Sequence, residues 1–375
     1  MRGFGSTRPV GEPLPMFPRF SGAFAWPEGY RAAWLDTGTS ALAVAVRALV
    51  LESGRNSPAI VLPAYTCPDV VSAVTWAGAR PVLVDTQPGL PWLALSALQQ
   101  FRDESWAGVI APHFLGLRHP MGSLREWCRE QGLGLIEDSA QLSPRSPVFR
   151  PVGEFVVLSF GRGKPIPAGG GVLLFCRERE TRVREITEAL PEQGGSTLTW
   201  KIRALMHNFA ITRPVYHFAK SIPWLNVGKT LYKPLSQPMR LDANRSHLGE
   251  AVIKTWPHQD DTICREVDSI LHGHASLTSL PPVCGWSDGQ PLLRWPVLAK
   301  TRQIAEDTVR RGAEMNMGIT RMYGRVLAEL DDMPSLSVCG SLDNAKDFAA
   351  RLFTLPVHSG VTGADIQALR RLVST

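Results

Sequence analysis

Short apolar segments alternate with helical segments through the first 170 residues, and this alternation constrains the fold more than any other feature. The apolar segments are AAWLD, AIVLPAY, RPVLVD, WAGVIAPHF, LGLIED, EFVVLSF and GVLLFC. Continuous apolar strands that alternate with helices form a mostly parallel sheet covered on both faces. We therefore predict an α/β fold whose site residues lie at the carboxyl ends of the strands.

Local signals set the boundaries of the elements in this first part. TGTSALAVAVRALVLES predicts a helix that starts at Thr39 or Ser40, and PDVVSAVTWAG predicts a helix that ends at Gly78. RPVLVD predicts a strand that ends in Asp85, and MGSLREWCREQG predicts a further helix.

The alternation stops at about residue 190. Residues 190–240 mix aromatic with basic side chains and carry no strand signal, so we expect helices and loops there. SHLGEAVIKTW and DDTICREVDSILHGHASL then predict amphipathic helices, and LLRWPVLA, GRVLAEL, AARLFTLPV and DIQALRRLV indicate a small α/β domain. We predict a large domain over residues 1–245, with an insertion at about 193–241, and a small C-terminal domain over residues 246–375.

The composition is that of an ordinary globular protein, with 44% hydrophobic and 20% charged residues. No apolar run is long enough to span a membrane, and the start, MRGFGSTRPVGEPLPMF, is broken by proline and glycine, unlike a secretory signal. The six cysteines are scattered, with no CxxC pair and no histidine at metal-ligand spacing. We therefore expect no disulfide framework, no metal site and a cytoplasmic protein.

Basic residues gather in the middle of the chain, whose net charge is +6. From Gln193 to Leu241 there is no Asp or Glu, but this segment contains Lys201, Arg203, Arg213, Lys220, Lys229, Lys233 and Arg240. A solvated basic face explains such a run. An anionic partner explains it equally well, either a phosphorylated substrate or the acidic head groups of a membrane surface. No nucleic-acid-binding module accompanies the run, so we do not expect nucleic acid as a partner.

Lys164 lies in an unusual setting for a surface lysine. It is surrounded by glycines and prolines in SFGRGKPIPAGGGV, between the apolar segments FVVLSF and GVLLFC. A lysine that acts as a nucleophile must be held near a carbonyl group and be partly desolvated. The setting of Lys164 fits that requirement.

Three other groups are placed as a phosphorylated aromatic aldehyde would require. Gly38, Thr39 and Ser40 form a helix start with free N–H groups and hydroxyls, which suits an anion, although an ordinary N-cap explains them too. Asp138 ends a buried strand, where a carboxylate needs a cation such as a protonated pyridine nitrogen or a salt-bridge partner. Gln141 follows on the same face, where it is able to reach a phenolic oxygen. Ser159, five residues before Lys164, is either a further phosphate ligand or a simple turn residue.

Taken together, these motifs resemble the DegT/DnrJ/EryC1/StrS family of sugar aminotransferases, which use pyridoxal 5′-phosphate (PLP). The matching segments are LDTGTSALAVAVRAL, VLPAYTCPDVVSAVTWAGARPVLVD, VIAPHFLGL, LGLIEDSAQ, and SFGRGK followed by GGGV. Weaker similarity runs from MRLDANRSHLGEAVIKTW to FAARLFTLPVHSGVT. The resemblance implies the fold of aspartate aminotransferase (fold type I), with a large PLP-binding domain and a smaller C-terminal α/β domain.

The resemblance also implies a role for each candidate residue. Lys164 would bind PLP covalently and act as the catalytic base, and Asp138 would pair with the pyridine nitrogen. Gln141 would contact the phenolic oxygen. The phosphate would be held by Gly38, Thr39, Ser40 and Ser159. The family further implies a homodimer with the active site at the interface.

Three departures from the family pattern concern the substrate more than the lysine chemistry. Cys67 replaces the aromatic residue that stacks on the cofactor ring in the family, and Gly161 and Arg162 occupy positions where a histidine or aromatic is common. The segment PIPAGGG lacks the acid that precedes the paired glycines. Relatives that act as dehydratases carry histidine in place of the lysine, and Lys164 separates this chain from them.

The implied function is transfer of an amino group, with glutamate as donor, to a nucleotide-diphosphate keto sugar in polysaccharide or glycoconjugate biosynthesis. The alternatives are another fold-type-I PLP reaction, such as sugar dehydration, or a non-catalytic relative that binds PLP or a sugar nucleotide. In the basic middle region we rank contact with the sugar nucleotide's pyrophosphate, or a structural role, above contact with a membrane.

Overall fold

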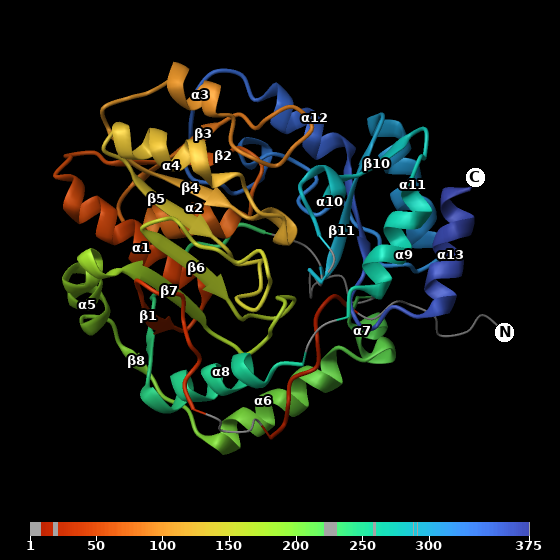
Figure 1. Ribbon diagram of the computed structural model, residues 1–375, viewed down its shortest axis with the longest axis horizontal. Coiled ribbons are helices and arrows are strands. Elements are labelled where there is room, and N and C mark those ends of the chain that lie inside the picture. Colours follow the sequence, from red (N-terminus) through yellow and green to blue (C-terminus); the bar gives the residue numbers. More distant parts are fainter. Residues whose placement is uncertain are drawn as a thin grey trace.

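A ten-stranded sheet crosses the larger part of the molecule in the computed structural model (Figure 1). The structure describes residues 9–17, 22–220, 231–257, 260–287, 289–290 and 292–374. Its strands are β1 Tyr30–Leu35, β2 Ala59–Pro63, β3 Arg80–Val84, β4 Trp106–Pro112, β5 Gly134–Asp138, β6 Phe155–Ser159, β7 Gly171–Cys176, β8 Glu192–Gln193, β9 Arg240–Leu241 and β12 Ser337–Val338. Their order is β12-β3-β2-β4-β5-β6-β7-β1-β9-β8. All neighbours from β12 to β6 run parallel, whereas β7 is antiparallel to β6 and β1. The prediction of a mostly parallel sheet is confirmed.

Helices cover both faces of this sheet. They include α1 Gly38–Ser53, α2 Pro68–Trp76, α3 Leu95–Gln100, α4 Met121–Glu130 and α5 Glu180–Glu188. Successive residues of β2 point to opposite faces: Ile60 packs in one core with α1, and Val61 packs in another with α4. Because both faces are covered, the central strands β2, β4 and β6 consist almost entirely of apolar residues.

Helix α1 packs closely on the middle of the sheet because two strand residues lack side chains. A Cβ atom on Gly108 would lie 2.6 Å from Cδ1 of Leu49, and one on Gly134 would lie 2.7 Å from the same atom. These glycines let α1 approach β4 and β5, so the start of the helix comes close to the ends of the strands.

The predicted helix boundaries differ from the observed ones by one or two residues. Helix α1 begins at Gly38 instead of Thr39 or Ser40, because Thr37 is the N-cap and its Oγ1 accepts a hydrogen bond from the Ser40 amide at 3.0 Å. Helix α2 ends at Trp76, and the predicted end, Gly78, adopts the left-handed conformation with φ of 82°. Strand β3 ends at Val84, one residue before Asp85.

The basic middle region is helical, as predicted, over α6 Thr197–Ala210 and α7 Arg213–Lys220. Helix α6 starts with a capping box between Ser196 and Thr199. Lys229, one of the basic residues named from the sequence, and Trp224, one of the aromatic residues that the region mixes with them, lie outside the described residues. Two-residue strands, β8 and β9, flank the region and were not expected from the sequence.

The N-terminal segment lies along α6. The amide of Leu14 donates to Oδ1 of Asn208 at 2.7 Å, and the indole N–H of Trp200 donates to the carbonyl of Pro15 at 3.0 Å. Trp200 packs in one core with Leu248 of α8 Ala243–Thr255. Helix α6 is therefore part of an outer layer, with α8 between it and the sheet (Figure 1).

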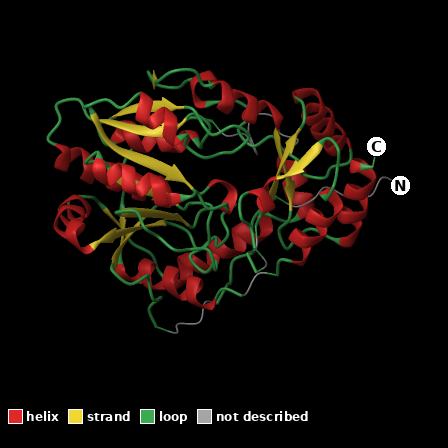
Figure 2. Ribbon diagram, turned by 45° about the horizontal axis from the view of Figure 1, so that its top comes forward, coloured by secondary structure: helices red, strands yellow, loops and turns green. Residues whose placement is uncertain are grey.

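A separate three-stranded antiparallel sheet forms the core of the C-terminal part (Figure 2). It contains β10 Leu277–Ser279, β11 Arg294–Ala299 and β13 Leu352–Pro356, and the surrounding helices are α9 Thr262–Leu271, α10 Leu280–Val283, α11 Arg302–Glu314, α12 Asp343–Arg351 and α13 Gly363–Val373. The predicted boundary between residues 245 and 246 lies within α8, whose apolar residues pack beside the large sheet. The exact division into domains stays a prediction.

The C-terminal part also contributes to the large sheet. Strand β12 pairs with β3, and Phe348 of α12 is buried in the same core as α1. The carboxylate of Asp85 accepts hydrogen bonds from the amides of Asn344 and Ala345, at 3.1 and 2.8 Å. Asp85 thus caps the start of α12 and ties it to the end of β3. Within the described residues, no helix is long and apolar enough to cross a bilayer.

Candidate active site

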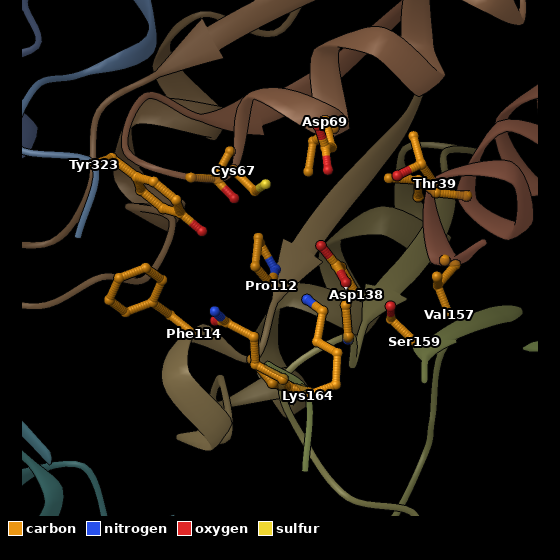
Figure 3. A pocket seen from close by; sticks show the side chains of 17 residues that line it. Thr39, Cys67, Asp69, Pro112, Phe114, Asp138, Val157, Ser159, Lys164 and Tyr323 are labelled. Atoms are coloured by element: carbon orange, nitrogen blue, oxygen red, sulfur yellow. Dashed lines mark hydrogen bonds between the residues drawn. The ribbon is translucent and has the colours of Figure 1, made fainter. Parts of the chain in front are cut away.

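A cavity lies where three parallel strands end and α1 begins (Figure 3). Its lining includes the last residues of β4, β5 and β6, which are Pro112, Asp138 and Ser159, and the first residue of α1, Gly38. This is the edge of a parallel sheet at which ligand sites form, because the helices that follow the strands leave a crevice there.

The cavity brings together most of the candidate residues from the sequence. Its lining contains Gly38, Thr39, Asp138, Gln141, Ser159 and Lys164. Ser40 is absent from this lining: its side chain is buried, and its hydroxyl lies 2.8 Å from Oγ1 of Thr37. The structure therefore places six of the seven predicted residues around one space, and Ser40 behind it.

Lys164 reaches the cavity from the loop between β6 and β7 (Figure 3). Two hydrogen bonds close the base of this loop, from Phe160 N to Gly170 O at 2.9 Å and from Gly169 N to Phe160 O at 2.6 Å. Gly163, Gly169 and Gly170 have positive φ angles, which only glycine adopts readily. Among the described residues, no side chain forms a hydrogen bond or ion pair with the Lys164 amine.

Asp138 faces the same space from the end of β5 (Figure 3). Its Oδ1 accepts a hydrogen bond from the Ala140 amide at 3.0 Å. Burial raises the pKa of Asp138, and this effect outweighs the lowering by the Ala140 hydrogen bond and by the charge of Lys164. A carboxylate in this position gains stability from a cationic ligand.

The start of α1 and two hydroxyl groups form one end of the cavity. Thr39 and Ser159 lie together at this end (Figure 3). A Cβ atom on Gly38 would lie 2.6 Å from Cβ of Ser159, so only glycine fits between the helix and β6. The first N–H groups of a helix lack intrahelical partners and attract anions. This end of the cavity is suited to a phosphate.

Gln141 is held in one orientation by the backbone. Its Oε1 accepts a hydrogen bond from the Leu115 amide at 2.7 Å, which leaves the side-chain NH₂ group as a donor. A ligand oxygen that enters the cavity is therefore able to accept a hydrogen bond from Gln141.

Several lining residues were missed by the sequence reasoning. Asp69, Phe114 and Tyr323 all line the cavity. The ring of Tyr323 lies 6.1 Å from that of Phe114 and 5.5 Å from that of Tyr65. Asp69 and Phe114 lie within or beside quoted motifs, so their position was a usable signal. Tyr323 lies in the segment between α11 and β12, and no local pattern marked it.

Cys67 lines the cavity at the N-cap of α2. Burial raises the pKa of its thiol to about 12, and the charge of Asp69 adds to this effect. A thiol with such a pKa is protonated at neutral pH and is a poor nucleophile. Cys67 is therefore better suited to packing in the cavity wall than to acting as a nucleophile.

A buried pair lies directly behind Asp138. His113 Nδ1 accepts a hydrogen bond from the His119 amide at 3.0 Å, so its Nε2 donates to Glu137 at 3.0 Å. Burial alone would raise the pKa of Glu137, but hydrogen bonds from His113 and from the amides of Val152 and Gly153 lower it. This network holds the ends of β4 and β5 in register. Across the described part of the chain, no cluster of three His, Cys, Asp or Glu residues is suited to a metal ion.

Comparison with known proteins relates this site to one family. The model of the DegT/DnrJ/EryC1/StrS aminotransferase family matches residues 20–210, a range that contains every candidate site residue named from the sequence. Among curated relatives, dTDP-4-dehydro-2,3,6-trideoxy-D-glucose 4-aminotransferase of Saccharopolyspora spinosa is 29% identical over 150 residues, 39% of this chain and 38% of the relative. GDP-perosamine synthase of Vibrio cholerae is 29% identical over 143 residues, 37% of this chain and 38% of the relative. The matched segments thus span less than half the length of these relatives.

The overall fold is shared with solved aminotransferase structures. PseC of Helicobacter pylori, an aminotransferase involved in the biosynthesis of pseudoaminic acid, superimposes with a TM-score of 0.68 at 15% identity. The superposition covers 92% of this chain and 86% of that one. The predicted fold, that of the fold-type-I aminotransferases, is confirmed.

Proposed function

The chain belongs to the DegT/DnrJ/EryC1/StrS aminotransferase family, and on this basis we propose that it is a PLP-dependent aminotransferase acting on a keto sugar. One observation carries the proposal most strongly. The amine of Lys164 and the carboxylate of Asp138 enter the same cavity, at the sheet edge where α1 begins (Figure 3).

The residues of the cavity fit PLP at each of its polar groups. Asp138 is buried at the cavity, where burial raises its pKa, and a protonated ring nitrogen would stabilise its charged form. The NH₂ group of Gln141 would donate to the phenolic oxygen. The hydroxyls of Thr39 and Ser159, with the start of α1, would hold the phosphate. We keep Ser40 as a supporting residue that fixes Thr37 and the first turn of the helix.

The chain's own residues would then move and hold protons. PLP, when bound, supplies an electron-withdrawing ring next to the substrate carbon that loses a proton. The Lys164 amine would be the base that takes this proton from the substrate carbon and delivers it to the C4′ carbon of the cofactor. Asp138, as a carboxylate, keeps the proton on the ring nitrogen. Phe114 and Tyr323 form an aromatic wall of the cavity, which would restrict the entry of water.

For the substrates we propose glutamate as amino donor and a nucleotide-diphosphate keto sugar as acceptor. The names of both curated relatives refer to dTDP- or GDP-linked sugars. One basic residue lies near the cavity wall: the carbonyl of Lys233 accepts a hydrogen bond from the hydroxyl of Ser72 in α2, the helix that carries Asp69, and we propose that its amine meets the pyrophosphate. As in the resembling enzymes, we propose a homodimer with the active site at the interface.

An absorption experiment tests the proposal directly. The purified protein is mixed with PLP, and its near-ultraviolet and visible spectrum is recorded before and after addition of glutamate, beside Lys164→Ala. We expect a visible band that requires Lys164 and that glutamate bleaches, because the donor's amino group stays on the cofactor.

Each other outcome points elsewhere. A band that neither glutamate nor glutamine bleaches would favour a PLP reaction other than transamination. The absence of any band, with PLP binding undetectable by equilibrium dialysis, would contradict the proposal and favour a binding protein without PLP chemistry.

A further inference from the structure

Helix α6 carries a row of large apolar side chains on its outward face. The row, called here the outer stripe, consists of Leu198, Ile202, Leu205, Met206 and Phe209. Their exposed fractions lie between 51% and 67%, which is high for residues of this size. Phe17, 71% exposed, lies beside the helix, where its ring contacts the Lys201 amine at 4.7 Å.

The spacing of the outer stripe shows that it is one continuous face. Its residues follow Leu198 at intervals of four, seven, eight and eleven, which places them on one side of a helix. The buried residues of α6, Trp200, Ala204 and His207, lie on the opposite side and pack toward α8. The helix thus has two apolar faces, and the described structure covers only one of them.

The charges around the stripe are positive. Lys201 borders the stripe, whereas the guanidinium of Arg203 turns inward toward Gly169 of the Lys164 loop, and neither α6 nor α7 contains an acidic residue. Two other basic residues of the region are already used inside the protein, since Arg213 pairs with Asp365 at 3.1 Å and Arg240 with Glu192 at 2.7 Å. Lys201 and Arg203 form no ion pair with a residue that the structure describes.

We propose that the outer stripe of α6 binds the surface of a membrane that contains anionic lipids. A helix of 14 residues with an exposed apolar face, a lysine at the border of that face and no acidic residue fits an interfacial helix, which lies in the plane of the bilayer surface. Helix α6 lies at the outer edge of the molecule, where a flat surface is able to reach it (Figure 1). Phe17 extends the same surface.

A second copy of the chain is a less suitable occupant. In a symmetric dimer formed through this face, the stripe would meet itself, and the lysine beside it would approach that of the partner. The region from Gln193 to Leu241 has no acid to compensate them. Anionic lipid head groups provide the missing negative charge.

Vesicle sedimentation tests this inference. The full-length protein, loaded with PLP, is centrifuged with vesicles of phosphatidylcholine alone or with added phosphatidylglycerol. The test variant is Leu205→Asn with Phe209→Asn, and the matched control is Val283→Asn with Met315→Asn, two exposed apolar residues on other elements. We expect binding to the anionic vesicles that salt weakens, and a loss of roughly tenfold or more in the test variant only.

The outcomes separate the possible occupants. Failure of the wild type to bind anionic vesicles at low salt would overturn the proposal, and so would equal binding by the test variant. Light scattering is run on the same samples: a dimer that Leu205→Asn with Phe209→Asn dissociates would show that a second copy covers the stripe, which also overturns it. Because these side chains are exposed, thermal unfolding of both variants should match that of the wild type.

Discussion

Asp138 is a carboxylate whose protonation is coupled both to ligand binding and to folding. Because burial raises its pKa in the folded protein, folding favours its neutral form. Its contribution to stability is therefore fully present below the ordinary carboxyl pKa and is lost as the pH rises through the raised value. At neutral pH without PLP, the charged side chain makes the folded state less stable.

The destabilising effect of the Asp138 charge leads to a prediction for Asp138→Asn. Without PLP, the variant should unfold at a higher temperature than the wild type at neutral pH, and the difference should shrink as the solution is made acidic. With PLP the order should reverse, because the variant has no charge to offer the ring nitrogen, and turnover should fall by about a hundredfold or more. Calorimetry with and without PLP measures this; a variant that PLP stabilises as much as the wild type would contradict the assigned role.

Gly38 occupies a position in which only glycine fits without a steric clash. An added methyl group would meet Cβ of Ser159 at 2.6 Å, between the start of α1 and the end of β6. We expect Gly38→Ala to lower the free energy of unfolding by about 1–3 kcal/mol and to weaken PLP binding, because both parts of the proposed phosphate site must move apart. Denaturant unfolding and dialysis against PLP measure the two effects.

Gly122 in α4 provides the matched control. A Cβ atom there would have no neighbour within 4 Å, so Gly122→Ala should leave PLP binding unchanged and stabilise the helix by up to about 1 kcal/mol. Equal effects of the two substitutions on PLP binding would show that the close packing at Gly38 has no part in the site.

At the scale of helices and strands, the contact of α1 with the sheet places the site. The three atoms nearest to a Cβ atom on Gly134 would all belong to the side chain of Leu49. Gly134→Ala alone should destabilise the fold by about 1–3 kcal/mol, and Leu49→Ala alone by about 2–5 kcal/mol. The double variant should lose less than the sum, because the new methyl group partly fills the space of the missing side chain. A double-mutant cycle in denaturant measures the coupling, and strict additivity would contradict this packing.

The same elements show why the fold was predictable from the sequence. Residues 59–63 are apolar throughout, and residues 134–136 are apolar before the acids Glu137 and Asp138, because both faces of the sheet are covered. The sequence of each segment therefore predicts a buried strand. Their polar ends then mark the edge at which Asp138 and Ser159 meet. The start of α1 was misplaced by one residue because the cap is the side chain of Thr37, and its role depends on a hydrogen bond that sequence alone leaves open.

Contributions from distant segments were not predictable in this way. Tyr323 lines the cavity from the segment between α11 and β12, and its position depends on tertiary packing against Tyr65 and Phe114. The spacing of the outer stripe in the sequence is the same as that of the buried face of any amphipathic helix. Only the packing of Trp200 toward α8 shows which apolar face is buried and which is left outside.

Over the whole molecule, the C-terminal part makes several contacts with the region around the site. Asp85, at the end of β3, caps α12, and Tyr323 closes the cavity beside Cys67. A ligand in the cavity should therefore affect the loop that carries Tyr323 as well as the large domain. This coupling is measurable without any substrate.

Hydrogen exchange with and without PLP tests it. We expect PLP to slow exchange at the start of α1, in the loop around Lys164 and in residues 320–326, where opening requires the loop to leave the cavity wall. The segment around Val283, which is exposed and does not line the cavity, serves as the internal reference. Tyr323→Phe should keep most of the protection, because the ring and its packing remain. Protection confined to residues before 220 would mean that the C-terminal part and the site respond independently, contrary to the arrangement in Figure 3.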